Sequence, residues 1–173
     1  MATFDENQES REDRLNRLVA DYQGMLLRMC YVSLRDMELA RDAVQETFLK
    51  AYRQLDGFRG QCSEKTWLSR IAINTCRSMQ RSAWHRHTDR RITPEDLPVA
   101  AEWNGWDDTL DVMCPIMMLP DKLKEVILLH YWQEMSVGEI AKALGLAHAS
   151  VSGRLKRART RLRDILEGRN LNG

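Results

Sequence analysis

The residues best suited to chemistry in this sequence are cations near its carboxy terminus. Residues 154–163 contain six of them and no carboxylate: Arg154, Lys156, Arg157, Arg159, Arg161 and Arg163. Guanidinium and ammonium groups bind phosphate oxygens, and small polar side chains beside them can hydrogen-bond to base edges. Ser150, Ser152 and Gly153 supply small residues just before the cations. This order of residue types indicates contact with duplex DNA.

A helix-turn-helix is predicted to position these residues. Ser136 and Glu139 have the spacing of a capping box, so a helix should begin there. Gly145 can adopt the left-handed conformation that ends it. A second helix is predicted from about residue 148, with apolar residues at helical spacing: Val151, Leu155, Ala158 and Leu162. Its first polar residues would face base edges and its later arginines would bind phosphates. The alternative is a solvated basic face on a carboxy-terminal helix.

A second basic block covers residues 65–91, with seven cations against the single carboxylate of Asp89. The cations are Lys65, Arg70, Arg77, Arg81, Arg86, Arg90 and Arg91. Rings lie among them, namely Trp67, Trp84, His85 and His87. Sites for single-stranded nucleic acid combine cations that bind the phosphate backbone with rings that stack on the bases. For Trp67 the alternative is a place in a helix core, where aromatic residues at helical spacing more often lie.

Three amphipathic helices are predicted in the amino-terminal half. The first covers residues 15–33, the second runs from the cap Asp36 to about residue 55, and the third runs from the cap Ser63 to about residue 84. Residues 94–118 carry three prolines and six carboxylates but no lysine or arginine. That composition indicates an acidic linker with at most a short helix around residues 107–113. Leu119 and Pro120 then open another helix.

These elements predict an all-α protein of two small helical domains joined by an acidic linker. We place a disordered amino terminus at residues 1–12, the first domain at 13–91 and the linker at 92–117. The second domain follows at 118–168 and a short tail at 169–173. A chain of 173 residues can form two modest cores of this kind.

Composition argues against several other classes of protein. No apolar run reaches the ~20 residues of a membrane span, and the first residues are too polar for a signal peptide, so we expect a cytoplasmic protein without membrane insertion. Four cysteines without CxxC spacing favour reduced thiols. No catalytic triad order or phosphate-binding glycine loop is visible, and His85 and His87 lack zinc-ligand spacing. We therefore expect no enzyme activity, metal or cofactor.

Three stretches in this order resemble bacterial sigma factors of the extracytoplasmic-function (ECF) group of the sigma-70 family. They are DAVQETFLKAYR (residues 42–53), FRGQCSEKTWLSRIAINTCRS (58–78) and the segment from Leu119 to Leu162. The resemblance implies a transcription initiation factor with a region 2 bundle and a region 4 helix-turn-helix. It also implies partners: the beta and beta′ subunits of core RNA polymerase, promoter DNA and an anti-sigma factor.

The resemblance further assigns residues to three surfaces. Core polymerase would contact Asp42, Gln45, Glu46, Phe48 and Leu49. The −10 element would be recognised and melted by Phe58, Ser63, Lys65, Trp67, Arg70, Ile73, Asn74, Arg77 and Arg81. The −35 element would be bound by His130, Ser150, Ser152, Gly153, Arg154, Lys156, Arg157 and Arg161. The acidic linker corresponds to a segment that family members thread through the polymerase cleft.

Some positions differ from the family pattern, and two other functions stay open. Ser78 stands where an aspartate is frequent, and His130 where an arginine often contacts phosphate. Gly153 within a helix costs up to ~1 kcal/mol against alanine, which suggests close approach of the backbone to DNA. One alternative is an ordinary DNA-binding regulator with an amino-terminal dimerisation or sensing domain. The other is a metalloenzyme that uses the cysteines and histidines.

Overall fold

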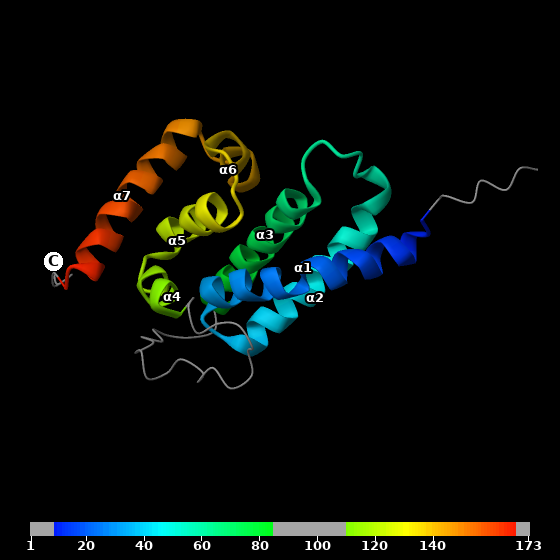
Figure 1. Cartoon of the computed structure of the whole chain (residues 1–173), viewed down its shortest axis with the longest axis horizontal. Helices are drawn as coiled ribbons and strands as arrows, with labels where there is room; N and C mark the ends of the chain where they lie inside the picture. Colours follow the sequence, from blue (N-terminus) through cyan, green and yellow to red (C-terminus); the bar gives the residue numbers. More distant parts are fainter. Residues whose placement is uncertain (1–8, 85–109, 169–173) are drawn as a thin grey trace, which may run out of the picture.

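The computed structural model describes residues 9–84 and 110–168, and all regular structure in these ranges is helical. The first group is α1 (Arg11–Leu34), α2 (Met37–Gln54) and α3 (Glu64–Trp84), with a 3-10 turn η1 (Leu55–Gly57) after α2. The second is α4 (Leu110–Met117), α5 (Asp121–Ile127), α6 (Val137–Leu144) and α7 (His148–Leu166). Figure 1 shows the two groups side by side, with α3 facing α5 and α6. The predicted all-α fold class is confirmed.

Local caps set the ends of the amino-terminal helices. The side chains of Ser10, Asp36 and Ser63 each accept a backbone N–H from three residues later at 3.0 Å. The caps predicted at Asp36 and Ser63 are therefore present. Helix α1 begins at Arg11, earlier than the predicted residue 15, because Ser10 caps a polar turn that carries no apolar periodicity. The predicted disordered segment 1–12 otherwise lies outside the described residues, as do the tail 169–173 and most of the linker.

Helix α4 occupies the end of the predicted acidic linker. A short helix was expected around residues 107–113, whereas α4 covers Leu110–Met117 and contains Pro115. Met113 and Met117 are buried and join the apolar core, and the helix contacts α1, α5 and α7. Burial of these two side chains outweighs the missing backbone hydrogen bond at Pro115. The last part of the predicted linker is thus a packed element of the second helical group.

The helix-turn-helix is formed by α6 and α7, as predicted. The N–H of Glu139 donates to Ser136 Oγ at 3.2 Å, and the N–H of Ser136 donates to Glu139 Oε2 at 2.8 Å, so the capping box is complete. Gly145 ends α6 in the left-handed conformation, with φ of 64°. Helix α5 continues into a π-helical turn, η4 (Leu128–Trp132), before the chain reaches Ser136.

Ser136→Ala is expected to lower the free energy of unfolding by about 1 kcal/mol, because the N–H of Glu139 loses its acceptor. The donated N–H and hydroxyl of Ser136 hold the pKa of Glu139 below its usual value. The contribution of the capping box is therefore present at neutral pH and lost as pH falls through that lowered pKa. Urea unfolding of the original chain and of Ser136→Ala at neutral and acidic pH tests this. The difference between their free energies of unfolding should narrow in acid, and a difference that widens would contradict the assignment.

Candidate nucleic-acid and polymerase interfaces

The basic side chains of α7 lie on its outer face. Val151, Leu155 and Ala158 are buried against the neighbouring helices. The predicted DNA-binding residues of this helix are all exposed or half-buried: Ser150, Ser152, Gly153, Arg154, Lys156, Arg157 and Arg161. Apart from its chain neighbours and the backbone of its own helix, no heavy atom of the described residues lies within 4 Å of the position that a Cβ on Gly153 would take. Packing within the chain therefore does not require a glycine here.

Turn η4 carries His130 and contacts α7 through Tyr131. The Nδ1 of His130 lies 2.9 Å from the carbonyl oxygen of Met135; because a carbonyl only accepts, Nδ1 carries the proton and Nε2 is left for another partner. The neighbouring Tyr131 accepts a hydrogen bond from Arg159 Nε at 2.6 Å. Sequence reasoning missed Tyr131, because the two residues are 28 positions apart and no local pattern links them.

An aromatic-lined pocket opens between η1 and α3. The rings of Phe58 and Trp67 stack with centroids 4.4 Å apart and an angle of 14° between planes. The pocket has a volume of about 560 Å³, and its lining includes Arg53, Gly57, Phe58, Gln61, Trp67 and Arg70. Trp67 is only 9% exposed, so it is both a core residue and part of the pocket wall. Arg53 and Gln61 are pocket residues that sequence reasoning did not assign.

Helix α1 holds this pocket in place. Arg17 donates two hydrogen bonds to the carboxylate of Glu64, each 2.9 Å long, and these bonds hold the pKa of Glu64 below its usual value. The Arg14 guanidinium lies 5.7 Å from the centroid of the Phe58 ring. These contacts fix the start of α3 and the loop that carries Phe58. Ser63, the cap of α3, is exposed at the end of that loop.

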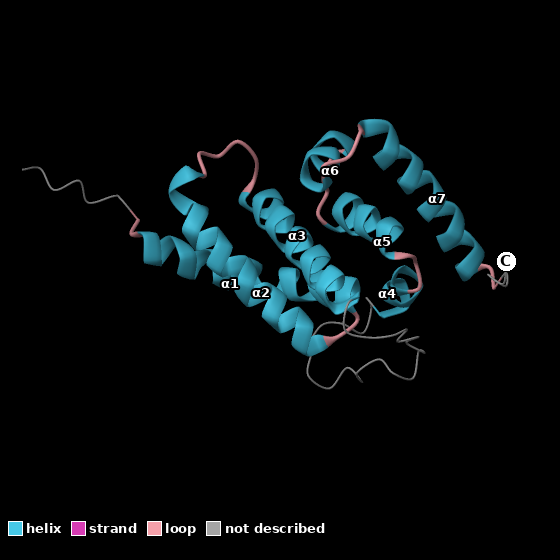
Figure 2. Cartoon of the chain, turned by 180° about the vertical axis from the view of Figure 1, so that it is seen from behind, coloured by secondary structure: helices cyan, strands magenta, loops and turns pink. Residues whose placement is uncertain are grey.

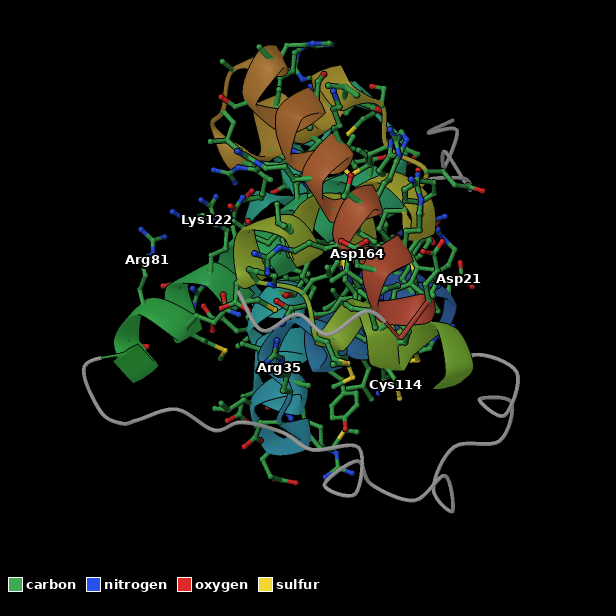
Figure 3. All side chains as sticks on the ribbon, turned by 90° about the vertical axis from the view of Figure 1, so that its left-hand side faces the viewer. Asp21, Arg35, Arg81, Cys114, Lys122 and Asp164 are labelled. Carbon is green, nitrogen blue, oxygen red and sulfur yellow. The ribbon has the colours of Figure 1, made fainter. Side chains whose placement is uncertain are left out.

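The basic side chains of α3 differ in what they contact. Arg81 is exposed and extends from α3 away from the other helices in Figure 3. Asn74 and Arg77 instead donate hydrogen bonds to the carbonyl oxygens of Ala143 and Leu144 at the end of α6. Ile73, predicted to bind the −10 element, is a fully buried core residue. A direct DNA contact is therefore excluded for Ile73 in this conformation, because its side chain fills the bundle.

The predicted polymerase-binding residues lie on α2. Asp42, Gln45 and Leu49 are exposed, and Leu49 exposes 53% of its surface. Glu46 is half-buried and pairs with Lys50 at 3.5 Å. Phe48 is only 8% exposed, so the structure places it in the core rather than on the predicted contact surface. Phe48 shares a buried face of α2 with Val44, four residues earlier, whereas Gln45 and Leu49 share an exposed one.

Exposed basic side chains on both α3 and α7 are typical of a protein that binds nucleic acid. The family profile of Sigma-70 region 2 matches residues 18–86, and that of Sigma-70 region 4 matches residues 110–162. The chain belongs to the sigma-70 family, in its ECF group, and is a transcription initiation factor that directs RNA polymerase to promoters. Within the described residues, no helix is both long and apolar enough to cross a membrane.

Individual relatives support this assignment over most of the chain. The chain is 32% identical to the RNA polymerase sigma-H factor of Pseudomonas aeruginosa, covering 87% of this chain and 84% of that protein. It is 31% identical to the ECF RNA polymerase sigma-E factor of Haemophilus influenzae, with coverages of 92% and 91%.

Two solved structures share the fold. One is CnrH in complex with the cytosolic domain of CnrY, with a TM-score of 0.65, 27% identity, and coverage of 92% of this chain and 91% of that one. The other is the sigma factor RpoE of Bartonella quintana in complex with the anti-sigma factor NepR. Its TM-score is 0.72 at 24% identity, and 89% of this chain and 97% of that chain are covered.

Proposed function

We propose that the two helical units divide promoter recognition between them. The unit at residues 118–168 binds the −35 element through α7, and the unit at 13–91 melts the −10 element through the pocket and α3. The observation that most directly supports the proposed melting of the −10 element is the pocket beside Phe58 and Trp67, with Arg53 and Arg70 in its wall. An unstacked base can enter such a pocket and stack on the rings while the guanidinium groups bind its phosphates. Segment 92–117 is the proposed connector, although α4 within it packs with the second unit.

The outer face of α2 is the proposed docking surface for core polymerase. Asp42, Gln45, Glu46 and Leu49 present two carboxylates, an amide and an exposed leucine on adjacent turns. An apolar centre flanked by polar groups is the usual anatomy of a protein interface. Phe48 supports this face from the core rather than contacting the beta or beta′ subunit. Catalysis stays with the polymerase, so the chain performs no covalent chemistry, and we place it with the polymerase in the cytoplasm.

An anti-sigma factor is the proposed negative regulator. The similar RpoE structure is a complex with the anti-sigma factor NepR. A protein that covered the surfaces of α2, α3 or α7 would block polymerase or promoter binding directly. The regulator would therefore compete with core polymerase for this chain.

Asn74→Ala and Arg157→Ala should separate the two promoter functions. In the polymerase complex, loss of the Asn74 amide should slow promoter opening while leaving −35 binding unchanged. Loss of the Arg157 guanidinium should weaken −35 binding by roughly tenfold, since a charge-assisted hydrogen bond contributes about 1.5 kcal/mol or more. Duplex binding and permanganate reactivity of unpaired thymines measure the two steps. Equal loss of both steps in either variant would contradict the division.

A further inference from the structure

Three arginines on the first two turns of α1 lie beside the loop that carries the aromatic pocket. They are Arg11, Arg14 and Arg17, spaced three residues apart, so that successive members are neighbours on the helix surface. Arg11 donates a hydrogen bond to the carbonyl oxygen of Tyr52, and Arg17 donates two to Glu64. Figure 2 shows the start of α1 and the α2–α3 loop at the same end of the bundle. Helix α1 therefore brings a row of guanidinium groups to the proposed −10 site.

Arg14 differs from the other two arginines in what its guanidinium contacts. Among the residues that the structure describes, it makes no hydrogen bond and no ion pair, and it lies 5.7 Å from the centroid of the Phe58 ring. The pKa of Glu64 is held below its usual value first by the hydrogen bonds from Arg17 and, more weakly, by the charge of Arg14. The half-buried Arg14 side chain is thus held near the ring while its N–H donors are left for a partner outside the chain.

Only one face of the Phe58 ring is open to a base. Trp67 covers the opposite face, with its ring centroid 4.4 Å away and an angle of 14° between the planes. Trp67 is itself 9% exposed, so its ring offers little further surface for stacking. Arg14 is not part of the pocket wall, but its guanidinium lies over the open face of Phe58 at the edge of the pocket. A base that stacks on Phe58 must therefore come between the ring and this guanidinium.

The space between the Phe58 ring and the Arg14 guanidinium is close to what a base requires. Stacked bases lie about 3.4 Å apart, so a base held between two planes needs roughly 7 Å. The guanidinium carbon is already 5.7 Å from the ring centroid, so an outward movement of roughly 1–2 Å makes room for a base. No hydrogen bond within the described residues has to break for Arg14 to move. Guanidinium planes stack on unpaired bases and add a cation–π attraction.

We propose that Arg14 is a base-contacting residue of the −10 site, where its guanidinium closes over a base that stacks on Phe58. This inference rests on the function proposed above and adds a residue of α1 to a site otherwise formed by η1, the following loop and α3. Arg14 contacts the base, whereas Arg53 and Arg70 in the pocket wall bind phosphates. The base is thereby held on both of its faces, by a ring and by a planar cation.

A forked promoter fragment tests this contact in the complex of the full-length chain with core polymerase. The fragment comes from a promoter found by run-off transcription, carries a fluorescent label and has its −10 segment already single-stranded. Arg14→Lys keeps the charge but loses the plane, so affinity for the fork, measured by fluorescence anisotropy, should fall at least about fivefold. Unchanged affinity would overturn the proposal.

Arg11→Lys is the matched control on the same helix. The guanidinium of Arg11 already donates to Tyr52 and lies 3.2 Å from Asp56 Oδ2, so it is not available to a base. The control should change affinity for the fork by less than about twofold, because such exposed ion pairs contribute little. An equal loss of affinity in Arg11→Lys and Arg14→Lys would also overturn the proposal.

Forks with abasic sites show whether Arg14 contacts a base or a phosphate. Each fork lacks one base of the −10 segment and is measured with the original chain and with Arg14→Lys. On one of these forks the two proteins should bind within about twofold of each other, because the base that Arg14 contacts is absent. The fivefold difference should persist on the other forks. A difference of the same size on every fork would indicate a phosphate contact and overturn the proposal.

The same substitution in a Phe58→Leu chain separates contact with the base from positioning of the ring. Arg14→Lys should weaken fork binding at least about twofold further in this chain, because the guanidinium still covers the base. No further loss would mean that Arg14 acts only by holding Phe58, which would overturn the proposal. Core-dependent transcription by the original chain is measured in parallel. Its absence would reject the proposed function itself, whereas transcription with normal fork binding by Arg14→Lys would reject only the contact by Arg14.

Discussion

Leu155→Ala is expected to lower the free energy of unfolding of the carboxy-terminal unit by about 2–5 kcal/mol. Leu155 is 2% exposed and is one of the residues that hold α7 against the helices behind it. The substitution leaves a cavity at the centre of the helix-turn-helix. Because whole domains are stable by only about 5–15 kcal/mol, this loss should unfold or loosen the unit and abolish −35 binding. Chemical denaturation and duplex binding measure the two effects.

Leu166→Ala is the matched control on the same helix. Leu166 is 69% exposed, so the same substitution should change stability by no more than about 0.5 kcal/mol. Polymerase binding through α2 should survive in both variants, because that face lies on the other unit. If Leu155→Ala and Leu166→Ala destabilised the protein equally, the assigned packing of α7 would be wrong.

Phe58→Ala should reduce promoter opening by roughly 5- to 150-fold, which corresponds to the ~1–3 kcal/mol of one base–aromatic stack. Phe58 lines the pocket and stacks on Trp67, so its removal takes away the ring on which an extruded base would rest. The defect should appear in formation of the open complex and not in −35 binding. Fluorescence of 2-aminopurine placed in the −10 element follows base extrusion directly.

Two conservative variants separate stacking from packing at this position. Phe58→Tyr keeps an aromatic ring and should open promoters nearly as well as the original chain. Phe58→Leu keeps an apolar side chain without a ring and should resemble Phe58→Ala. Normal opening by Phe58→Leu would show that the ring serves only to fill the bundle, and the pocket would then lose its proposed role.

Local signals were sufficient to predict most of the fold. Asp36, Ser63 and the Ser136–Glu139 pair act within a single turn, so their caps were visible from spacing alone. Helix α4 was placed several residues too early because carboxylates and Pro115 masked its apolar residues. The period of 3.6 residues already places Phe48 on the buried face of its helix, with Val44 and Ala51. The family resemblance assigned Phe48 and Ile73 to contact surfaces, and both are buried.

The contacts between units could not be predicted in this way. Asn74 and Ala143 are 69 positions apart, and nothing near either residue specifies the other. The same holds for Lys124 and Ser33, which are 91 positions apart. Long-range contacts of this kind depend on how two finished surfaces fit together. They show that Asn74 and Arg77, two of the proposed DNA-binding residues, are also engaged within the chain.

Run-off transcription tests the central claim most directly. The purified chain is combined with bacterial core polymerase on a pool of promoter fragments, with core polymerase alone as the control. We predict specific start sites only when both proteins are present, and their templates should share elements near −10 and −35. Absence of core-dependent initiation, together with stable duplex binding by the chain alone, would contradict this account and indicate an autonomous DNA-binding regulator.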